Sequence, residues 1–225
     1  MNSKQCAKFY KKNKQEFKGE RPHEVLLSKL KSLLKDQFID QRVICIDVGA
    51  CVGDYIHHIR DMHTGRILCF EPNPVNIDTL KFKIHLETDV ILYTYALSNQ
   101  EKIESFMHFD SSDNKSGNQV GGLRAGGRHI CNVDTKRLDT ILKQDLEAAD
   151  TIIKFIKIDT EGNDTNVIKG MGEYINKTEY MIFECSDCLD DHRGPGIKNP
   201  MKDIVDYLSI NGFDVYKIGK SKLLK

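Results

Sequence analysis

The sequence predicts a single α/β domain in which a doubly wound, mostly parallel sheet carries helices on both faces. Three observations support this prediction. Strand-length apolar runs alternate with helical patterns, as in parallel strands joined by helical crossovers. The first run, Val43–Val48, is continuously apolar, as expected for a strand buried on both faces. At 225 residues, with 40% hydrophobic residues, the chain has the size and composition of one such domain.

The remaining elements follow the same alternation. Pro72 and Pro74 end the second apolar run, because proline cannot donate to a sheet ladder, and Gly212 ends the last helical pattern. We expect a further strand at 102–109, then a short strand and the start of a helix within 132–142. The expected core strands are 43–48, 66–71, 90–97, 152–159, 180–184 and 214–218, and the expected helices are 54–62, 75–86, 164–169 and 201–211.

Residues 1–40 form a separate unit before the domain at 41–225. A lysine-rich start precedes an amphipathic helix, which we expect to pack on the sheet edge; an alternative is that it helps to close over a ligand. The apolar residues of this helix are Val25, Leu26, Leu30, Leu33, Leu34 and Phe38. Sheets of this kind usually end with a seventh strand antiparallel to the sixth, and only 220–225 remain to form it. Either that strand is very short or, as we slightly prefer, the chain is one module of a longer protein.

The stretch 111–128 is rich in Gly, Ser and Asn and has little apolar surface to bury. We expect it to be mobile. A long loop inside a compact domain is often functional, so the stretch is a candidate active-site lid, and a surface insertion is the alternative.

Composition excludes several classes of protein. The 33 basic and 33 acidic residues cancel, so no global field gathers nucleic acid. No apolar run is long enough to span a membrane. The seven cysteines are an odd number, and Cys45 and Cys69 lie within apolar runs. We therefore expect reduced thiols and a cytoplasmic protein with no membrane span.

The turn after the first strand is the candidate cofactor site. It reads Asp47-x-Gly49-Ala50-x-x-Gly53, which differs from the G-x-G-x-x-G fingerprint of dinucleotide-binding proteins. Glycines allow the backbone to turn sharply and to approach a ligand closely, and the helix N-terminus offers N–H groups. The acid two residues before the first glycine suits a ligand with an ammonium group, such as the methionine part of S-adenosylmethionine.

Two further segments extend this site. Glu71 ends the second strand, just before Pro72, where an acid can bond both hydroxyls of a ribose. Ala96 and Leu97 end the expected third strand, where an adenine would lie against small apolar surface and the Ser98 N–H.

Five segments, in this order, resemble the FkbM family of methyltransferases: Ile46–Gly53, Phe70-Glu-Pro-Asn-Pro74, Tyr95–Ser98, Leu138-Asp139 and Lys157-Ile-Asp-Thr-Glu-Gly162. The resemblance covers roughly residues 43–218. It implies a Rossmann-like class I methyltransferase fold, S-adenosylmethionine as cofactor and methyl transfer to an oxygen, commonly a hydroxyl of a sugar or natural product. Two mild departures are Cys51, where the family often has Asn, and Asp164, where it often has Glu.

Asp159 and Glu161 follow the fourth core strand, near the place of the cofactor's sulfur in such a fold. We expect Asp159 to contact the cofactor and to act as the base or to orient the acceptor, with helix capping as the alternative. Glu161 holds the loop or positions the acceptor hydroxyl. His192 is a further candidate catalytic residue, with a plain surface position as its alternative.

Glu184 and Asp187 lie on the same edge as Asp159 and offer other chemistry. They could supply the base, contact a sugar or join Asp159 around Mg²⁺ or Mn²⁺, although the sequence does not establish a divalent cation. A zinc site at Cys185, Cys188 and His192 lacks a fourth ligand, and we assign no metal ligands.

The leading hypothesis is an S-adenosylmethionine-dependent O-methyltransferase for a sugar hydroxyl in a glycan or glycosylated product. Fusion to glycosyltransferase modules would fit a chain that is one module of a longer protein. One alternative is an RNA ribose methyltransferase, because Lys154, Lys157 and Asp159 suggest lysine–aspartate chemistry and the N-terminal lysines could grip phosphates. Zero net charge and few aromatic residues argue against a nucleic-acid partner. The other alternative is a non-catalytic module that keeps the cofactor fold.

Overall fold

The computed structural model describes the sheet, its helices and the turns that carry most of the predicted site. The described residues are 8, 11–13, 15, 42–108, 118–120, 128–145, 150–185, 201–218 and 223–225. The amphipathic helix expected before residue 40 lies outside this part of the chain. His192 and most of the predicted lid also lie outside it.

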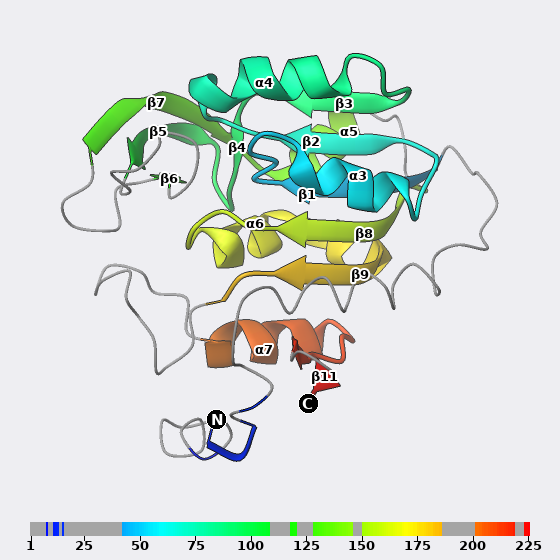
Figure 1. Ribbon diagram of the computed structural model, residues 1–225. Coiled ribbons are helices and arrows are strands. Elements are labelled where there is room, and N and C mark those ends of the chain that lie inside the picture. Colours follow the sequence, from blue (N-terminus) through cyan, green and yellow to red (C-terminus); the bar gives the residue numbers. More distant parts are fainter. Residues whose placement is uncertain are drawn as a thin grey trace.

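A five-stranded parallel sheet forms the centre of the fold, with strand order β3-β2-β1-β8-β9. The order reverses between β1 and β8, which confirms the predicted doubly wound sheet. The strand arrowheads point to the left in Figure 1, so the carboxyl ends of the strands share one edge. The strands are β1 (Val43–Val48), β2 (Ile67–Phe70), β3 (Val90–Tyr93), β8 (Ile152–Ile158) and β9 (Thr178–Phe183).

Side chains of the central strands alternate between two apolar cores. In β1, Ile44, Ile46 and Val48 enter the larger core, and Cys45 enters the smaller one. Helices α3 (Asp54–Arg60) and α4 (Pro74–Ile84) cover the smaller core. The larger core is covered by α5 (Leu138–Asp145), α6 (Asp164–Gly170), the 3₁₀-helix η2 (Gly172–Lys177) and α7 (Met201–Ile210).

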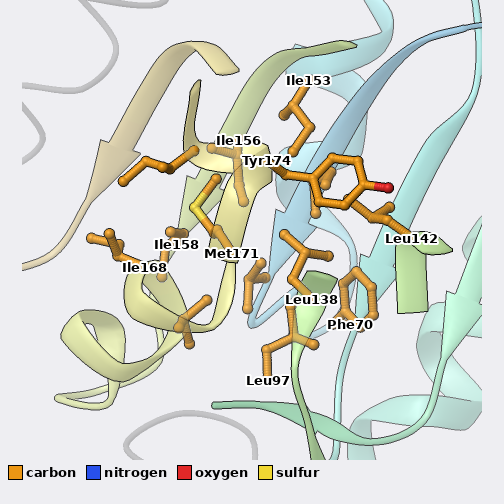
Figure 2. Packing of buried hydrophobic residues seen from close by; sticks show 14 of the residues in the cluster. Phe70, Leu97, Leu138, Leu142, Ile153, Ile156, Ile158, Ile168, Met171 and Tyr174 are labelled. Carbon is orange, nitrogen blue, oxygen red and sulfur yellow. The ribbon is translucent and has the colours of Figure 1, made fainter. Parts of the chain in front are cut away.

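Figure 2 shows the larger core at close range. Leu138 and Leu142 of α5, together with Tyr174 of η2, pack toward the β8 side chains Ile153 and Ile156. Both faces of the sheet are therefore buried, as the continuous apolar runs predict. The sequence patterns gave no sign of η2, which follows α6 almost without a break.

The predicted strand over 90–97 is wrong in one respect, because the chain leaves the central sheet half-way along it. The last pair of β3 is Tyr93 opposite Phe70, where β2 ends. With no partner beyond that point, the chain bends, and β4 (Ala96–Leu97) pairs with β7 (Arg128–Lys136).

A second, four-stranded sheet of order β4-β7-β5-β6 stands beyond the carboxyl edge of the first (Figure 1). It contains β5 (Lys102–His108), which confirms the strand expected at 102–109, and β6 (Asn118–Val120). Strand β6 lies within the stretch that we expected to be an unstructured lid, and it pairs with β5. The segments on either side of β6 lie outside the described residues.

The sixth core strand expected at 214–218 does not join the central sheet. Only β10 (Lys217–Ile218) forms, and it pairs antiparallel with β11 (Leu223–Leu224) in a separate two-stranded sheet. Residues 214–218 are at least partly exposed, whereas the β1 and β8 interiors are buried, so this segment lacks the apolar surface of a core strand. That the chain is one module of a longer protein stays a prediction.

No helix within the described ranges is both long and apolar enough to cross a membrane. The cysteines in the same ranges, namely Cys45, Cys51, Cys69, Cys131 and Cys185, are free thiols.

Two turns meet closely at the carboxyl edge, and Gly49 makes the approach possible. Its φ is 72°, and a Cβ built on it would overlap the backbone carbonyl oxygen of Asp159. Both facts require glycine, since an L side chain would be strained by the dihedral and would push the two turns apart.

Replacing Gly49 by alanine tests this approach. We expect Gly49→Ala to lower the free energy of unfolding by about 2–5 kcal/mol, combining about 1–2 for the left-handed dihedral with about 1–3 for overpacking. The matched control is Gly212→Ala. Gly212 has a φ of 86° and no atom within 4 Å of a built Cβ, so it reports the dihedral alone. Equal losses in urea unfolding of the two variants would contradict the close approach.

Candidate active site

Four predicted site residues stand in one row along the carboxyl edge of the central sheet. The N–H groups of Glu71, Gly49, Asp159 and Glu184 each donate to the last carbonyl of the neighbouring strand, at 2.9–3.1 Å. The parallel ladder thus continues one residue past the strands and brings the four residues side by side.

The glycine turn between β1 and α3 is held by the end of β2. The N–H groups of Gly49 and Ala50 both donate to the Phe70 carbonyl, at 2.9 and 3.1 Å, and the Gly53 N–H donates to the Ala50 carbonyl. We expected the N-terminus of α3 to offer N–H groups to a ligand. The N–H groups of Gly49, Ala50 and Gly53 precede that helix and bond to the sheet and to the turn itself, so the expectation for the helix stays a prediction.

The backbone of the turn is unusual at Cys51. Its φ is 52°, in the left-handed region where side chains are disfavoured, and Gly53 has a φ of 84°. A Cβ on Gly53 would lie 2.8 Å from the Leu80 methyl group, so α3 and α4 pack closely at this point. Gly49 and Gly53 therefore shape the turn: Gly49 lies against the residue that follows β8, and Gly53 lies against α4.

Glu71 joins the glycine turn to the start of α4. Its carboxylate accepts hydrogen bonds from the Cys51 N–H at 2.7 Å, the Asn73 N–H at 2.8 Å and the Asn76 amide at 3.3 Å. The residue is only 4% exposed. Burial raises the pKa of the Glu71 carboxyl, and these hydrogen bonds oppose the rise. A carboxylate has about four acceptor positions, so one is left for a ligand hydroxyl.

The Glu-Pro-Asn-Pro motif has a local structural reason. The Asn73 side chain accepts from the Val75 N–H at 3.1 Å and caps α4, whose first residue is Pro74. The cap starts the helix immediately after the strand. Glu71 and Pro72 are thereby kept at the sheet edge.

Asp47 is fully buried, and its partner is Lys157 on the neighbouring strand. The two residues are directly opposite in the β1–β8 register, and the ammonium lies 3.2 Å from the Asp47 carboxylate. Apart from this ion pair, neither Asp47 oxygen accepts a hydrogen bond within the described structure. We expected Asp47 to face a ligand ammonium. The structure supplies that positive charge from Lys157, and direct contact with a ligand stays a prediction.

Lys157 has several partners around the same ammonium. It donates to the Gly49 carbonyl at 2.7 Å and lies 3.9 Å from the Asp159 carboxylate and 5.7 Å from the centre of the Tyr55 ring. Burial alone would lower its pKa, but the charges of Asp47 and Asp159 outweigh burial, and the pKa is raised. Burial raises the pKa of Asp47, and Lys157 opposes that rise. The charged lysine is therefore the counter-ion of the buried carboxylate.

Asp159 and Glu161 occupy the turn between β8 and α6. The Asp159 side chain is 52% exposed and stands at the open edge of the sheet, as its predicted catalytic role requires. Glu161 is partly buried and has a φ of 56°. Of the described residues other than glycine, three have a positive φ, and two of them are Cys51 and Glu161 in the turns of this site.

Ala96 and Leu97 are both buried and belong to β4. The Ser98 N–H, which we expected to face an adenine, donates to the Lys136 carbonyl at 2.8 Å. The Leu97 carbonyl accepts from the Asn163 amide at 3.0 Å, so this segment is tied to the β8–α6 turn. Ala96 and Leu97 therefore lie near the site, and their contact with a base stays a prediction.

His192 lies outside the described residues, as do Asp187 and Cys188. In the part of the chain that the structure describes, no group of three or more His, Cys, Asp or Glu side chains could hold a metal ion. A divalent cation at Asp159 and Glu184 stays a prediction, and it would need ligands beyond these two carboxylates.

The sequence between residues 47 and 215 matches the model of the FkbM methyltransferase domain. The chain belongs to this family. Its strand order and its glycine turn agree with the Rossmann-like class I methyltransferase fold that the family resemblance implied. No curated protein matches the sequence.

Two solved structures show a general likeness to this FkbM domain. Precorrin-6y C5,15-methyltransferase from Geobacter metallireducens GS-15 has 13% sequence identity and a TM-score of 0.43, with coverage of 84% of this chain and 70% of its own. An rRNA methylase from Streptococcus thermophilus has 10% identity and a TM-score of 0.44, with coverage of 87% and 81%. At these values neither structure bears on the substrate of this chain.

S-adenosylmethionine is the cofactor that this family implies, and the FkbM domain offers groups that fit it. Glu71 has acceptor capacity for a ribose hydroxyl at the end of β2. The exposed carboxylate of Asp159 stands in the same edge row and suits a cationic ligand.

Sequence reasoning missed two residues of the site. The pairing of Lys157 with Asp47 could have been predicted from the sequence. Asp47 stands two residues before Gly49, and Lys157 stands two residues before Asp159 on the neighbouring parallel strand. The role of Asp164 could not have been predicted from the sequence. Its buried carboxyl accepts a hydrogen bond from Thr160, but an acid at the start of a helix has the same sequence pattern whether it is buried or exposed.

Removing Lys157 should leave Asp47 buried without a counter-ion. We expect Lys157→Met to lower the free energy of unfolding by about 3–5 kcal/mol and the double variant with Asp47→Asn to recover part of that loss. Lys154→Met is the matched control on the same strand. Its partner Glu179 is 43% exposed and can be hydrated, so we expect this variant to lose only about 1 kcal/mol of the free energy of unfolding. Urea unfolding of the four proteins measures this, and equal losses for the two lysines would contradict the pairing.

Proposed function

We propose that this FkbM domain is an S-adenosylmethionine-dependent O-methyltransferase that acts on a sugar hydroxyl in a glycan or glycosylated product. The observation that carries the proposal is the half-exposed Asp159 carboxylate, which stands in one edge row with Glu71 and the glycine turn. A carboxylate in this place can receive the proton of a hydroxyl acceptor. The choice of a sugar rests on the family resemblance.

Glu71 would hold the ribose, Asp159 would face the sulfonium end, and Ala96 and Leu97 would lie near the adenine. When bound, the cofactor supplies a methyl group that is already activated for transfer. The protein therefore has to align an oxygen with that methyl group and exclude water. The prearranged hydrogen bonds of the glycine turn and of Glu71 serve alignment, because these groups need not reorganise.

Asp159 carries the proposed proton transfer. The bound cofactor would supply the methyl group, and the Asp159 carboxylate would receive the proton of the acceptor hydroxyl. Lys157 orders this carboxylate from beneath, at 3.9 Å, while it pairs with Asp47. Glu161, on the same turn, is placed to orient the hydroxyl.

Cofactor recognition is tested first, by calorimetric titration with S-adenosylmethionine and, separately, with NAD. We expect Glu71→Gln to weaken S-adenosylmethionine binding about 10- to 100-fold, since hydrogen bonds to a charged group contribute about 1.5–3 kcal/mol. The control is Asp54→Asn in the first turn of α3, which removes one charge from an exposed side chain and should change affinity less than about twofold. Binding of NAD instead, or no binding of the methyl donor, would refute the proposal.

The catalytic role of Asp159 is tested with a panel of methyl glycosides as acceptors, with and without Mg²⁺. We expect Asp159→Asn to lower kcat about 10²- to 10⁴-fold while the dissociation constant of S-adenosylmethionine changes far less. Glu184→Gln alters the next acid in the edge row and should retain most activity. If Glu184→Gln loses kcat and Asp159→Asn does not, the base has been assigned to the wrong strand end.

A further inference from the structure

The carboxyl group of Asp164 lies beneath the turn that carries the proposed catalytic residues. Asp164 is the first residue of α6 and is 1% exposed. Its carboxylate accepts from the Thr160 N–H at 3.4 Å, the Thr160 hydroxyl at 3.0 Å and the Gly162 N–H at 3.1 Å. These contacts span the turn from one side of Glu161 to the other.

The turn needs such an anchor because its backbone is intrinsically unfavourable. Glu161 and Gly162 are consecutive residues with φ values of 56° and 111°. A residue with a side chain costs about 1–2 kcal/mol in the left-handed region, so this geometry persists only where the surroundings hold it. The N–H groups of Thr160 and Gly162, on either side of Glu161, both donate to the Asp164 carboxylate. These two hydrogen bonds fix the backbone conformation at Glu161 and so the direction of its Cα–Cβ bond.

We propose that Asp164 is a positioning residue whose carboxylate holds the turn carrying Asp159 and Glu161 in the arrangement used for methyl transfer. The inference rests on the proposed function for its catalytic consequence. Asp164 itself is 1% exposed, so we assign it no direct contact with cofactor or acceptor. It acts through the backbone of Thr160 and Gly162.

The charges around Asp164 make this hold sensitive to pH. Burial, then Asp159 and Glu184, raise the pKa of Asp164 to about 7, against the hydrogen bonds from Thr160 and Gly162. The negative charge of Asp164 in turn helps to raise the pKa of Lys157, after the larger effects of Asp47 and Asp159. Above this pKa the carboxylate accepts all three hydrogen bonds. Below it, the bound proton turns one acceptor position into a donor, so the turn is held less firmly as pH falls through about 7.

The first experiment observes the turn directly, without any acceptor. In ¹⁵N-labelled protein, we expect the Thr160 and Gly162 amide resonances to move with pH between about 5 and about 9, with a shared midpoint near 7. The movement should vanish in Asp164→Asn, which cannot ionise, and persist in Asp164→Glu, which can. Thr160 and Gly162 resonances of Asp164→Asn that coincide with those of the wild-type protein at pH about 9, or that titrate equally in both proteins, would overturn the proposal.

The second experiment separates positioning from binding. With a methyl glycoside that serves as acceptor, kcat of the wild-type protein should rise with pH through about 7. Asp164→Asn should lack that rise and lie about 10- to 100-fold lower at high pH, because small misplacements of reacting groups have effects of this size. Its dissociation constant for S-adenosylmethionine should stay within about twofold of wild type. Asp164→Glu should recover part of kcat. Parallel loss of cofactor affinity and kcat would show a merely structural role.

The two experiments fail in different ways. If the wild-type protein binds S-adenosylmethionine but methylates no sugar, the proposed function is wrong, and the amide titration still decides whether Asp164 holds the turn. If methylation occurs and the Asp164→Asn profile matches wild type, the proposed function stands and the role of Asp164 is refuted.

Discussion

The ion pair between Asp47 and Lys157 fixes the relation between the two central strands, and the site depends on that relation. Both residues lie within strands whose other side chains are apolar except for Lys154, which pairs with Glu179. Side chains alternate between the faces of a strand, so a shift of β1 by one residue would move Asp47 into the larger core, away from its counter-ion. Each unpaired charge in such a core is strongly unfavourable. The main effect of the ion pair is therefore to disfavour other registers of β1 against β8, and its net contribution to stability is small.

The edge of the sheet inherits this register. With Asp47 opposite Lys157, the residues two positions later, Gly49 and Asp159, also meet, and the missing side chain of Gly49 lets the two turns touch. Glu71 then reaches the glycine turn from β2 through the Cys51 N–H. The backbone N–H groups of Gly49, Ala50, Cys51 and Gly53 are bonded within the protein before any ligand arrives. Such preorganisation suits a reaction in which the cofactor brings the chemical activation and the enzyme brings alignment.

Most of the fold was predictable because burial on both faces leaves a plain mark in the sequence. The β1 and β8 segments are mostly apolar, interrupted only by Asp47 in β1 and by Lys154 and Lys157 in β8, and Pro72 follows closely on the end of β2. The errors arose where pairing depends on a partner elsewhere in the chain. Residues 90–97 form one apolar run, yet β3 ends at Tyr93 because β2 ends opposite it, and Ala96 pairs with β7 instead. The periodicity of one segment carries no information about where its neighbour stops.

The site was predictable as a set of motifs and not as a conformation. Asp47, Glu71 and Asp159 could be found because glycine turns and strand ends mark them. Left-handed Cys51 and Glu161 could not, because neither residue type favours that backbone region. Local preferences fail at the two turns that face the cofactor edge, and the surrounding hydrogen bonds impose the conformation there. At Cys51 the Glu71 carboxylate accepts the N–H, and around Glu161 the Asp164 carboxylate accepts on both sides. In each turn a buried acid holds a backbone that the sequence alone disfavours, so changing either acid should disturb the site before it disturbs the fold.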